Sequence, residues 1–176
     1  MSDQVDHPGR MMVIWNFIED WMQRNAPDLL VKLRPPATEP QIQAVEAALS
    51  VTFPEEIKAF WSIHDGTDNT LFGWWQFLSM QEIMRECQQN RTYEWWPATW
   101  IPFASDWCGD YICMDMDSAL QERRGQIMYY DHEGGNLSVA PSLWILMSTF
   151  VNDLEDGEYE VNEYGVLVSE EVNFPW

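Results

Sequence analysis

PPATEPQIQAVEAALSVTFPEEIKAFWSIHDG, residues 35–66, predicts two consecutive helices that begin a folded domain. Thr38 and Gln41 have the spacing of a capping box, in which two residues satisfy backbone N–H groups at the start of a helix. Apolar residues then recur at three- and four-residue spacing, which is typical of a helix with one buried face. They are Ile42, Val45 and Leu49. The first of the two helices therefore starts next to Thr38.

The second helix of this stretch begins at Pro54, because the fixed φ of proline suits the first turn of a helix. The apolar residues that it is expected to bury are Ile57, Phe60 and Trp61. Gly66 is expected to end the helix, since glycine readily adopts the left-handed conformation that closes many helices.

Two further helices are predicted on either side. Residues 11–25 have the apolar spacing of an amphipathic helix, which Pro27 ends. Ser79 and Glu82 form another capping box, and the helix that they open carries Cys87 on its apolar face.

The second half of the chain is predicted to contain most of the strands. The three runs that resemble strands are residues 100–105, 111–116 and 126–131. Pro141 begins a last helix, which closes near Gly157, and the tail alternates like a strand pair around residues 162–165.

This order of elements predicts a single α+β domain, with a mixed, largely antiparallel sheet and helices packed on one face. Residues 1–34 are interpreted as an N-terminal helix and linker. Residues 35–155 form the α+β domain, and residues 156–176 a C-terminal hairpin extension.

Composition and charge exclude several classes of function. With 46% hydrophobic residues, the chain can form a substantial core. A net charge of −20 argues against nucleic acid or an anionic membrane as partner, and favours a basic partner or solubility alone. Three cysteines support neither a disulfide framework nor a zinc ribbon. The N-terminus lacks the apolar core of a signal peptide, so a soluble, cytoplasmic protein is expected.

The stretch ASDWCGDYICMDMD, residues 104–117, crowds four aspartates and two cysteines around one glycine. A cation site is conceivable, but the spacing lacks the pattern of a calcium-binding loop, and turn and strand positions explain the carboxylates equally well. Neither Cys108 nor Cys113 has a histidine base in a local catalytic motif. We therefore expect no metal, no cofactor and no catalytic residue. The four aspartates are Asp106, Asp110, Asp115 and Asp117.

His132 lies between Asp131 and Glu133 at the end of a predicted strand. The three side chains could form an acid–base site, which keeps a hydrolase open as a third hypothesis. A turn closed by two glycines is the simpler reading.

The ordered set of motifs resembles the SUKH superfamily, which includes bacterial immunity proteins and yeast cell-wall synthesis regulators. The likeness covers roughly residues 35–154. Its first part matches at Pro36, Ile42, Glu46, Phe53, Pro54, Glu55, Trp61, His64, Asp65 and Gly66. Its second part matches at the strand from Trp100, at Asp106, Gly109, Asp110 and Asp115, and from residue 125 to 133. This chain departs from the usual pattern at Ser50, Phe53 and Asp65.

The resemblance implies a binding role without catalysis, with Gly109 and Asp110 shaping a turn between two strands. The first hypothesis is an immunity protein that neutralises a cognate basic toxin of nuclease type. The alternative is a scaffold or adaptor like the yeast cell-wall regulators. The sequence leaves the oligomeric state open.

Tryptophans and acidic residues are the candidate contacts for a partner protein, because tryptophan dominates interface hot spots and carboxylates pair with basic groups. The alternative is that half of these rings belong to the core. The candidates are Trp74, Trp75, Glu94, Trp95, Trp96, Asp131 and Glu133.

Overall fold

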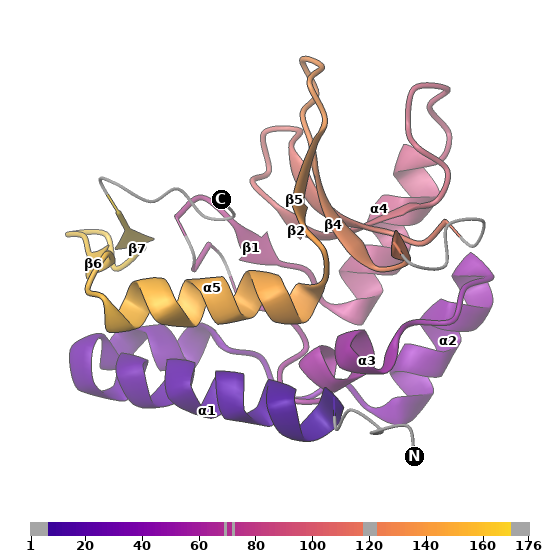
Figure 1. Cartoon of the computed structure of the whole chain (residues 1–176). Coiled ribbons are helices and arrows are strands. Elements are labelled where there is room, and N and C mark those ends of the chain that lie inside the picture. The colour runs from indigo at the N-terminus through magenta and orange to yellow at the C-terminus, as the bar shows by residue number, and fades with distance from the viewer. Residues whose placement is uncertain (1–6, 69, 72, 118–122, 170–176) are drawn as a thin grey trace.

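The computed structural model describes residues 7–68, 70–71, 73–117 and 123–169. Helices precede the sheet, interrupt it once and follow it (Figure 1). The elements are α1 (His7–Asn25), the 3-10 helix η1 (Pro27–Lys32), α2 (Glu39–Leu49), α3 (Glu55–Trp61), β1 (Gln76–Phe77), α4 (Met80–Asn90), β2 (Trp100–Ser105), β3 (Tyr111–Asp115), β4 (Gln126–Tyr130), β5 (Leu137–Ala140), α5 (Leu143–Glu155), β6 (Glu160–Val161) and β7 (Leu167–Val168).

The sheet is a five-stranded antiparallel meander. Its strands lie in the order β1-β2-β3-β4-β5, so each strand pairs with its neighbour in the sequence. All four pairings are antiparallel, and β6 and β7 form a separate antiparallel pair. The predicted α+β architecture with a largely antiparallel sheet is therefore confirmed.

Successive side chains of β3 point to opposite faces of the sheet and enter two different apolar clusters. Ile112 and Met114 belong to the main cluster, which the helices share. Cys113 lies in a smaller cluster with Trp96, Trp100 and Tyr130. The hydroxyl of Tyr111 donates to Glu86 Oε2 of α4 at 3.0 Å. The face opposite the main core is thus partly covered by α4 and by residues 91–99, in addition to the helices packed on the first face.

Both predicted capping boxes are present. The backbone N–H of Thr38 donates to Gln41 Oε1 at 2.8 Å, and that of Ser79 donates to Glu82 Oε2 at 2.8 Å. Cys87 is fully buried, as its position on the apolar face predicts. These helix starts follow from residues within one turn of one another.

Gly66 does not end α3, which stops at Trp61; this prediction is wrong. Gly66 has a φ of +76°, and a Cβ built on it would lie 2.5 Å from the carbonyl oxygen of Phe77. Glycine is therefore required because the chain crosses β1 closely, a long-range cause that local helix signals do not contain.

The sequence reading missed β5 and placed the start of the last helix at Pro141. The helix begins at Leu143, with Ser142 Oγ accepting the N–H of Ile145 at 3.3 Å. Residues 137–140 pair with β4 across a register shift. This irregularity, together with glycines directly before the strand, removes the clean alternation that marks a strand in a sequence.

The flanking segments pack into the same core as the middle of the chain. α1 lies beside α5 in Figure 1 and buries five large side chains in the main cluster. They are Met11, Ile14, Trp15, Ile18 and Met22. From the C-terminal hairpin, Leu167 is fully buried. The proposed bounds 1–34, 35–155 and 156–176 remain an interpretation; residues 170–176 lie outside the described part.

Across the described ranges, no helix has both the length and the apolar character needed to cross a bilayer.

Candidate functional site

Four loops gather where the central strands end. The β2–β3 turn (106–110) and the β4–β5 loop (131–136) are adjacent because β3 pairs with β4, with Tyr111 opposite Tyr130. Residues 73–75 join them because Gln76 pairs with Ser105 at the end of β2. Residues 91–97 join them because Trp96 packs against Tyr130. We call these four segments the strand-end surface.

The β2–β3 turn is held by its own aspartate. Asp106 Oδ1 accepts the backbone N–H groups of Cys108 at 2.8 Å and Asp110 at 3.0 Å. Gly109 has a φ of +119°, and an added Cβ would lie 3.2 Å from Cγ of His132. The turn therefore needs glycine both for its backbone conformation and for the closeness of the neighbouring loop.

Trp107 occupies the middle of this turn in a left-handed conformation, with a φ of +61°. Such a backbone is unusual for a bulky residue and persists only when its surroundings hold it. Here the N–H of Trp107 donates to Ser105 Oγ at 3.0 Å, and its Nε1 donates to Gln76 Oε1 at 2.8 Å. The ring is nevertheless 51% exposed. Trp107 is thus a fixed aromatic group on the surface.

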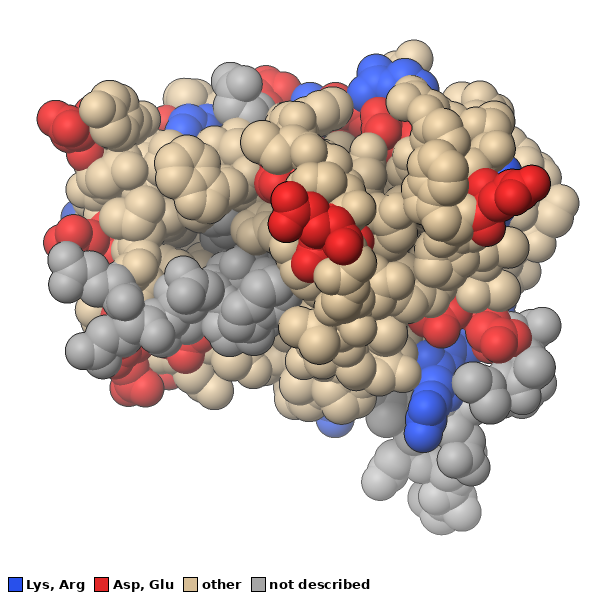
Figure 2. Space-filling model, turned by 90° about the horizontal axis from the view of Figure 1, so that it is seen from above, with Lys and Arg blue, Asp and Glu red and all other residues tan. Residues whose placement is uncertain are grey.

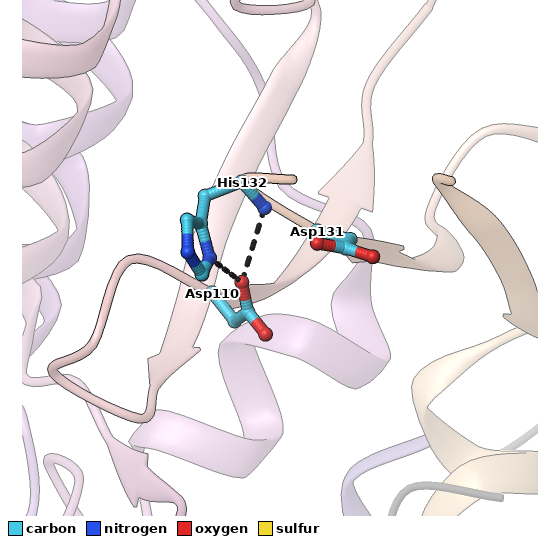
Figure 3. A group of neighbouring side chains, drawn as sticks. All are labelled: Asp110, Asp131 and His132. Carbon is cyan, nitrogen blue, oxygen red and sulfur yellow. Dashed lines mark hydrogen bonds and ion pairs between the residues drawn. The ribbon is translucent and has the colours of Figure 1, made fainter. Parts of the chain in front are cut away.

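Asp110 connects the two central loops (Figure 3). Its Oδ1 accepts the backbone N–H of His132 at 3.1 Å and lies 2.5 Å from His132 Nδ1. Its Oδ2 accepts the hydroxyl of Tyr129. Burial acts to raise the pKa of Asp110, but the hydrogen bonds from Tyr129 and His132 outweigh it and lower that pKa. The hydrogen bond to Asp110 raises the pKa of His132. These contacts fix the β4–β5 loop against the β2–β3 turn.

Ligand-type atoms of Asp110, Asp131 and His132 lie within 4.8 Å of one another, which is close enough for a metal ion. Both oxygens of Asp110 already accept hydrogen bonds, and Asp131 Oδ1 accepts the N–H of Glu133 at 2.8 Å. The same bonds hold Asp131, His132 and Glu133 in a turn. The expectation of no metal and no catalysis stays a prediction.

Asp106 lies in the same turn as Asp110, whereas Asp115 and Asp117 lie apart from this group. Asp115 lies at the opposite end of β3, where its Oδ1 accepts Thr99 Oγ1 at 2.8 Å and the N–H of Asp117 at 3.0 Å. The crowding in the sequence therefore reflects turns at the two ends of one strand.

Only two of the four nominated tryptophans are available to a partner. Trp74 is 81% and Trp95 is 68% exposed, whereas Trp75 and Trp96 are buried. Trp75 packs edge-on against Tyr129, and Trp96 contacts the rings of Tyr111 and Tyr130. The prediction that Trp75 and Trp96 contact a partner is therefore corrected. Both rings are buried and pack against tyrosines of β3 and β4.

The sequence reading missed two exposed rings, Trp107 and Tyr93, of which the latter stacks on Trp95 with centroids 4.7 Å apart. The signal that could have found Trp107 is its place in a short aspartate- and glycine-containing turn, because side chains at the tip of such a turn face solvent.

The acidic candidates also lie on the strand-end surface. Glu94 and Glu133 are exposed, and Asp131 is half-buried. Figure 2 shows the molecule from the side where the β4–β5 loop projects: isolated carboxylate groups stand among uncharged side chains, and Lys and Arg lie towards the margins.

Fold and site together define a one-domain α+β protein whose turns at one end of an antiparallel sheet carry exposed aromatic and acidic side chains. The chain belongs to the SMI1/KNR4 family (SUKH-1), whose family model matches residues 36–149. The resemblance to the SUKH superfamily is thereby confirmed.

Three similar proteins come from yeasts. The chain is 28% identical to the cell wall assembly regulator SMI1 of Saccharomyces cerevisiae over 98 residues, which cover 51% of this chain and 19% of that protein. It is 23% identical over 187 residues to the cell wall biosynthesis/cell cycle regulator smi1 of Schizosaccharomyces pombe, covering 85% of this chain and 37% of the relative. The KNR4/SMI1 homolog 2 of Debaryomyces hansenii is 35% identical over 65 residues, or 36% and 11% of the two chains. The matches thus span well under half of each relative.

Proposed function

We propose that this protein binds a basic partner protein through the strand-end surface, without catalysing a reaction, and that the partner is a toxin of nuclease type, which binding neutralises. The observation that carries the proposal is the exposure of four aromatic side chains among carboxylates on one surface of a chain with a net charge of −20. The four are Trp74, Tyr93, Trp95 and Trp107.

The chemistry of a nuclease explains why such a surface would inhibit it. A nuclease needs a basic groove for its phosphate substrate, and an acidic protein can occupy that groove. Long-range attraction accelerates the encounter, whereas a few well-packed aromatic side chains set the lifetime of the complex. The fixed conformation of Trp107 adds to affinity because little entropy is lost when an ordered side chain binds.

The test measures binding kinetics against the toxic domain encoded by the neighbouring gene. The association rate should fall steeply as salt is added, because salt screens the attraction between the acidic protein and a basic toxin. At physiological ionic strength this attraction extends over a Debye length of about 8 Å. Trp95→Ala should mainly raise the dissociation rate. Tyr164→Ala is the matched control, since this ring is 79% exposed on the hairpin between β6 and β7. Equal effects of the two substitutions, with an association rate independent of salt, would refute the proposed surface.

Two carboxylates are nominated as central contacts, Glu94 and Glu133. Replacing either by Gln should cost about 2–5 kcal/mol of binding free energy if it leaves a basic toxin group buried and unpaired. Carboxylates at the rim should mainly affect the association rate.

A second candidate is an adaptor that binds proteins of cell-wall assembly, as the printed names of the yeast relatives suggest. Co-expression separates the two functions. An immunity protein rescues growth of cells that express the neighbouring toxic domain, whereas an adaptor leaves growth arrested and instead changes cell-wall integrity when its gene is deleted.

A further inference from the structure

β5 is an open edge of the sheet. It pairs with β4 on one side, and among the described residues no strand pairs with its other side. Leu137 is 54% exposed, Ser138 is exposed and Val139 is half-buried. Natural edge strands are usually protected by charged side chains, by proline within the strand or by a covering element. β5 contains neither charge nor proline, although Pro141 follows it directly.

The surroundings of β5 lack the acidic character of the rest of the chain. From Gly134 to Asn152 the sequence contains no Asp, Glu, Lys or Arg, and this run includes β5 and most of α5. On α5, Ile145 is 38% exposed. A hollow of about 380 Å³ runs beside the strand, and Arg123 is the charged residue that lines it together with Gln126, Ser138, Val139, Ala140 and Pro141. Apart from Asp131 and Glu133 in the loop that precedes it, β5 therefore lies in a neutral to basic surface of a protein with a charge of −20.

We propose that β5 is a self-association site, at which the strand pairs antiparallel with β5 of a second copy about a two-fold axis. The two five-stranded sheets then form one continuous sheet.

The charge distribution favours a second copy over another occupant. A two-fold interface places each surface patch against the same patch, so like charges within it would face each other. Residues 134–152 contain no carboxylate, so pairing there sets no like charges directly opposite each other, and only the long-range repulsion between two acidic molecules remains. A basic partner would instead be attracted to the acidic strand-end surface. The hairpin projects beyond the helices in Figure 1, so the β5 backbone can approach a second copy.

Sedimentation velocity of the purified full chain over a wide concentration range tests this proposal. We expect a reversible monomer–dimer equilibrium. Dimerisation should become tighter when salt is raised from about 50 mM to about 500 mM, because screening removes the repulsion between two acidic molecules. Added salt should instead weaken a complex with a basic partner, so the salt dependence of association distinguishes the two modes of binding. A chain that remains monomeric at every concentration and salt level, or one that captures other proteins at β5 but never itself, overturns the proposal.

Charge substitutions locate the contact. In a two-fold antiparallel pair centred on Ser138, the two Leu137 side chains are diagonal neighbours about 7–8 Å apart, so Leu137→Lys and Leu137→Glu should each weaken dimerisation by bringing like charges together. Mixing the two variants should restore association, because opposite charges then meet. Val31→Lys is the matched control: Val31 is 81% exposed on η1, and its substitution should leave dimerisation unchanged. Ser138→Lys provides the same test if Leu137 variants fold poorly, as judged by circular dichroism. Dimerisation unaffected by Leu137→Lys and Ser138→Lys, or mixing without recovery, would contradict an interface at β5.

Discussion

Trp95 and Trp96 are neighbours in the sequence with opposite environments, so their substitution by alanine separates folding from binding. Trp96 is 6% exposed, its ring lies 4.6 Å from that of Tyr130, and its Nε1 donates to the Trp100 carbonyl at 3.3 Å. Removal of a buried aromatic side chain leaves a cavity and costs about 3–5 kcal/mol. Trp96→Ala should therefore lower the free energy of unfolding by that amount.

Trp95→Ala should behave differently. Trp95 is 68% exposed and stacks on Tyr93, which also faces solvent, and its side chain shares a hydrogen bond with Tyr130. An aromatic pair and a hydrogen bond each contribute about 0.5–1.5 kcal/mol, so the loss should stay below that caused by removing a buried ring. The assay is urea unfolding followed by far-ultraviolet circular dichroism, which does not depend on tryptophan fluorescence. Trp74→Ala and Trp75→Ala repeat the comparison, with 81% and 8% exposure. If Trp95→Ala destabilised the protein as much as Trp96→Ala, the assignment of one ring to the surface and the other to the core would fail.

Three further outcomes are expected. Gly109→Val should cost on the order of 1–3 kcal/mol of stability. Valine is strained at a φ of +119°, and its Cβ would lie 3.2 Å from the ring of His132. An unchanged denaturation midpoint would show that the turn tolerates a side chain. His132→Asn should reduce stability more at about pH 5.5 than at about pH 8.5. The reason is that the raised pKa of His132 makes its contribution complete below the unfolded value of about 6.5 and lost as the pH rises through the folded pKa. The pKa of Asp110 is lowered, so its contribution to stability is lost only at more acidic pH, as the pH falls through the folded pKa. If the stability loss caused by His132→Asn grew from about pH 5.5 to about pH 8.5, the ion pair between His132 and Asp110 would be excluded. Chelation should leave the melting temperature unchanged, since both oxygens of Asp110 already accept hydrogen bonds; a melting temperature lowered by chelator and restored by a divalent cation would reverse that view.

Much of the fold could be predicted because its signals are local. The capping boxes at Thr38 and Ser79, and the β3 side chains that point alternately into the two core clusters, depend on residues within a few positions of one another. The candidate surface was predicted less completely. Glu94, Trp74 and Trp95 are exposed as a contact role requires, whereas Trp75 and Trp96 are buried and exposed Trp107 lies outside the predicted set.

The sequence alone determined where α2 and α4 begin, which runs form β2, β3 and β4, and that the chain belongs with the SUKH proteins. Each of these depends on short-range hydrogen bonding, on side-chain periodicity or on an ordered set of motifs. Only the tertiary structure decided which of two adjacent tryptophans is buried, why Gly66 must be glycine, and that Asp110 meets His132 across two loops. Those outcomes depend on which distant segment lies opposite a residue. That neighbour is fixed by strand pairing and core packing over the whole chain, and no local window of sequence contains it.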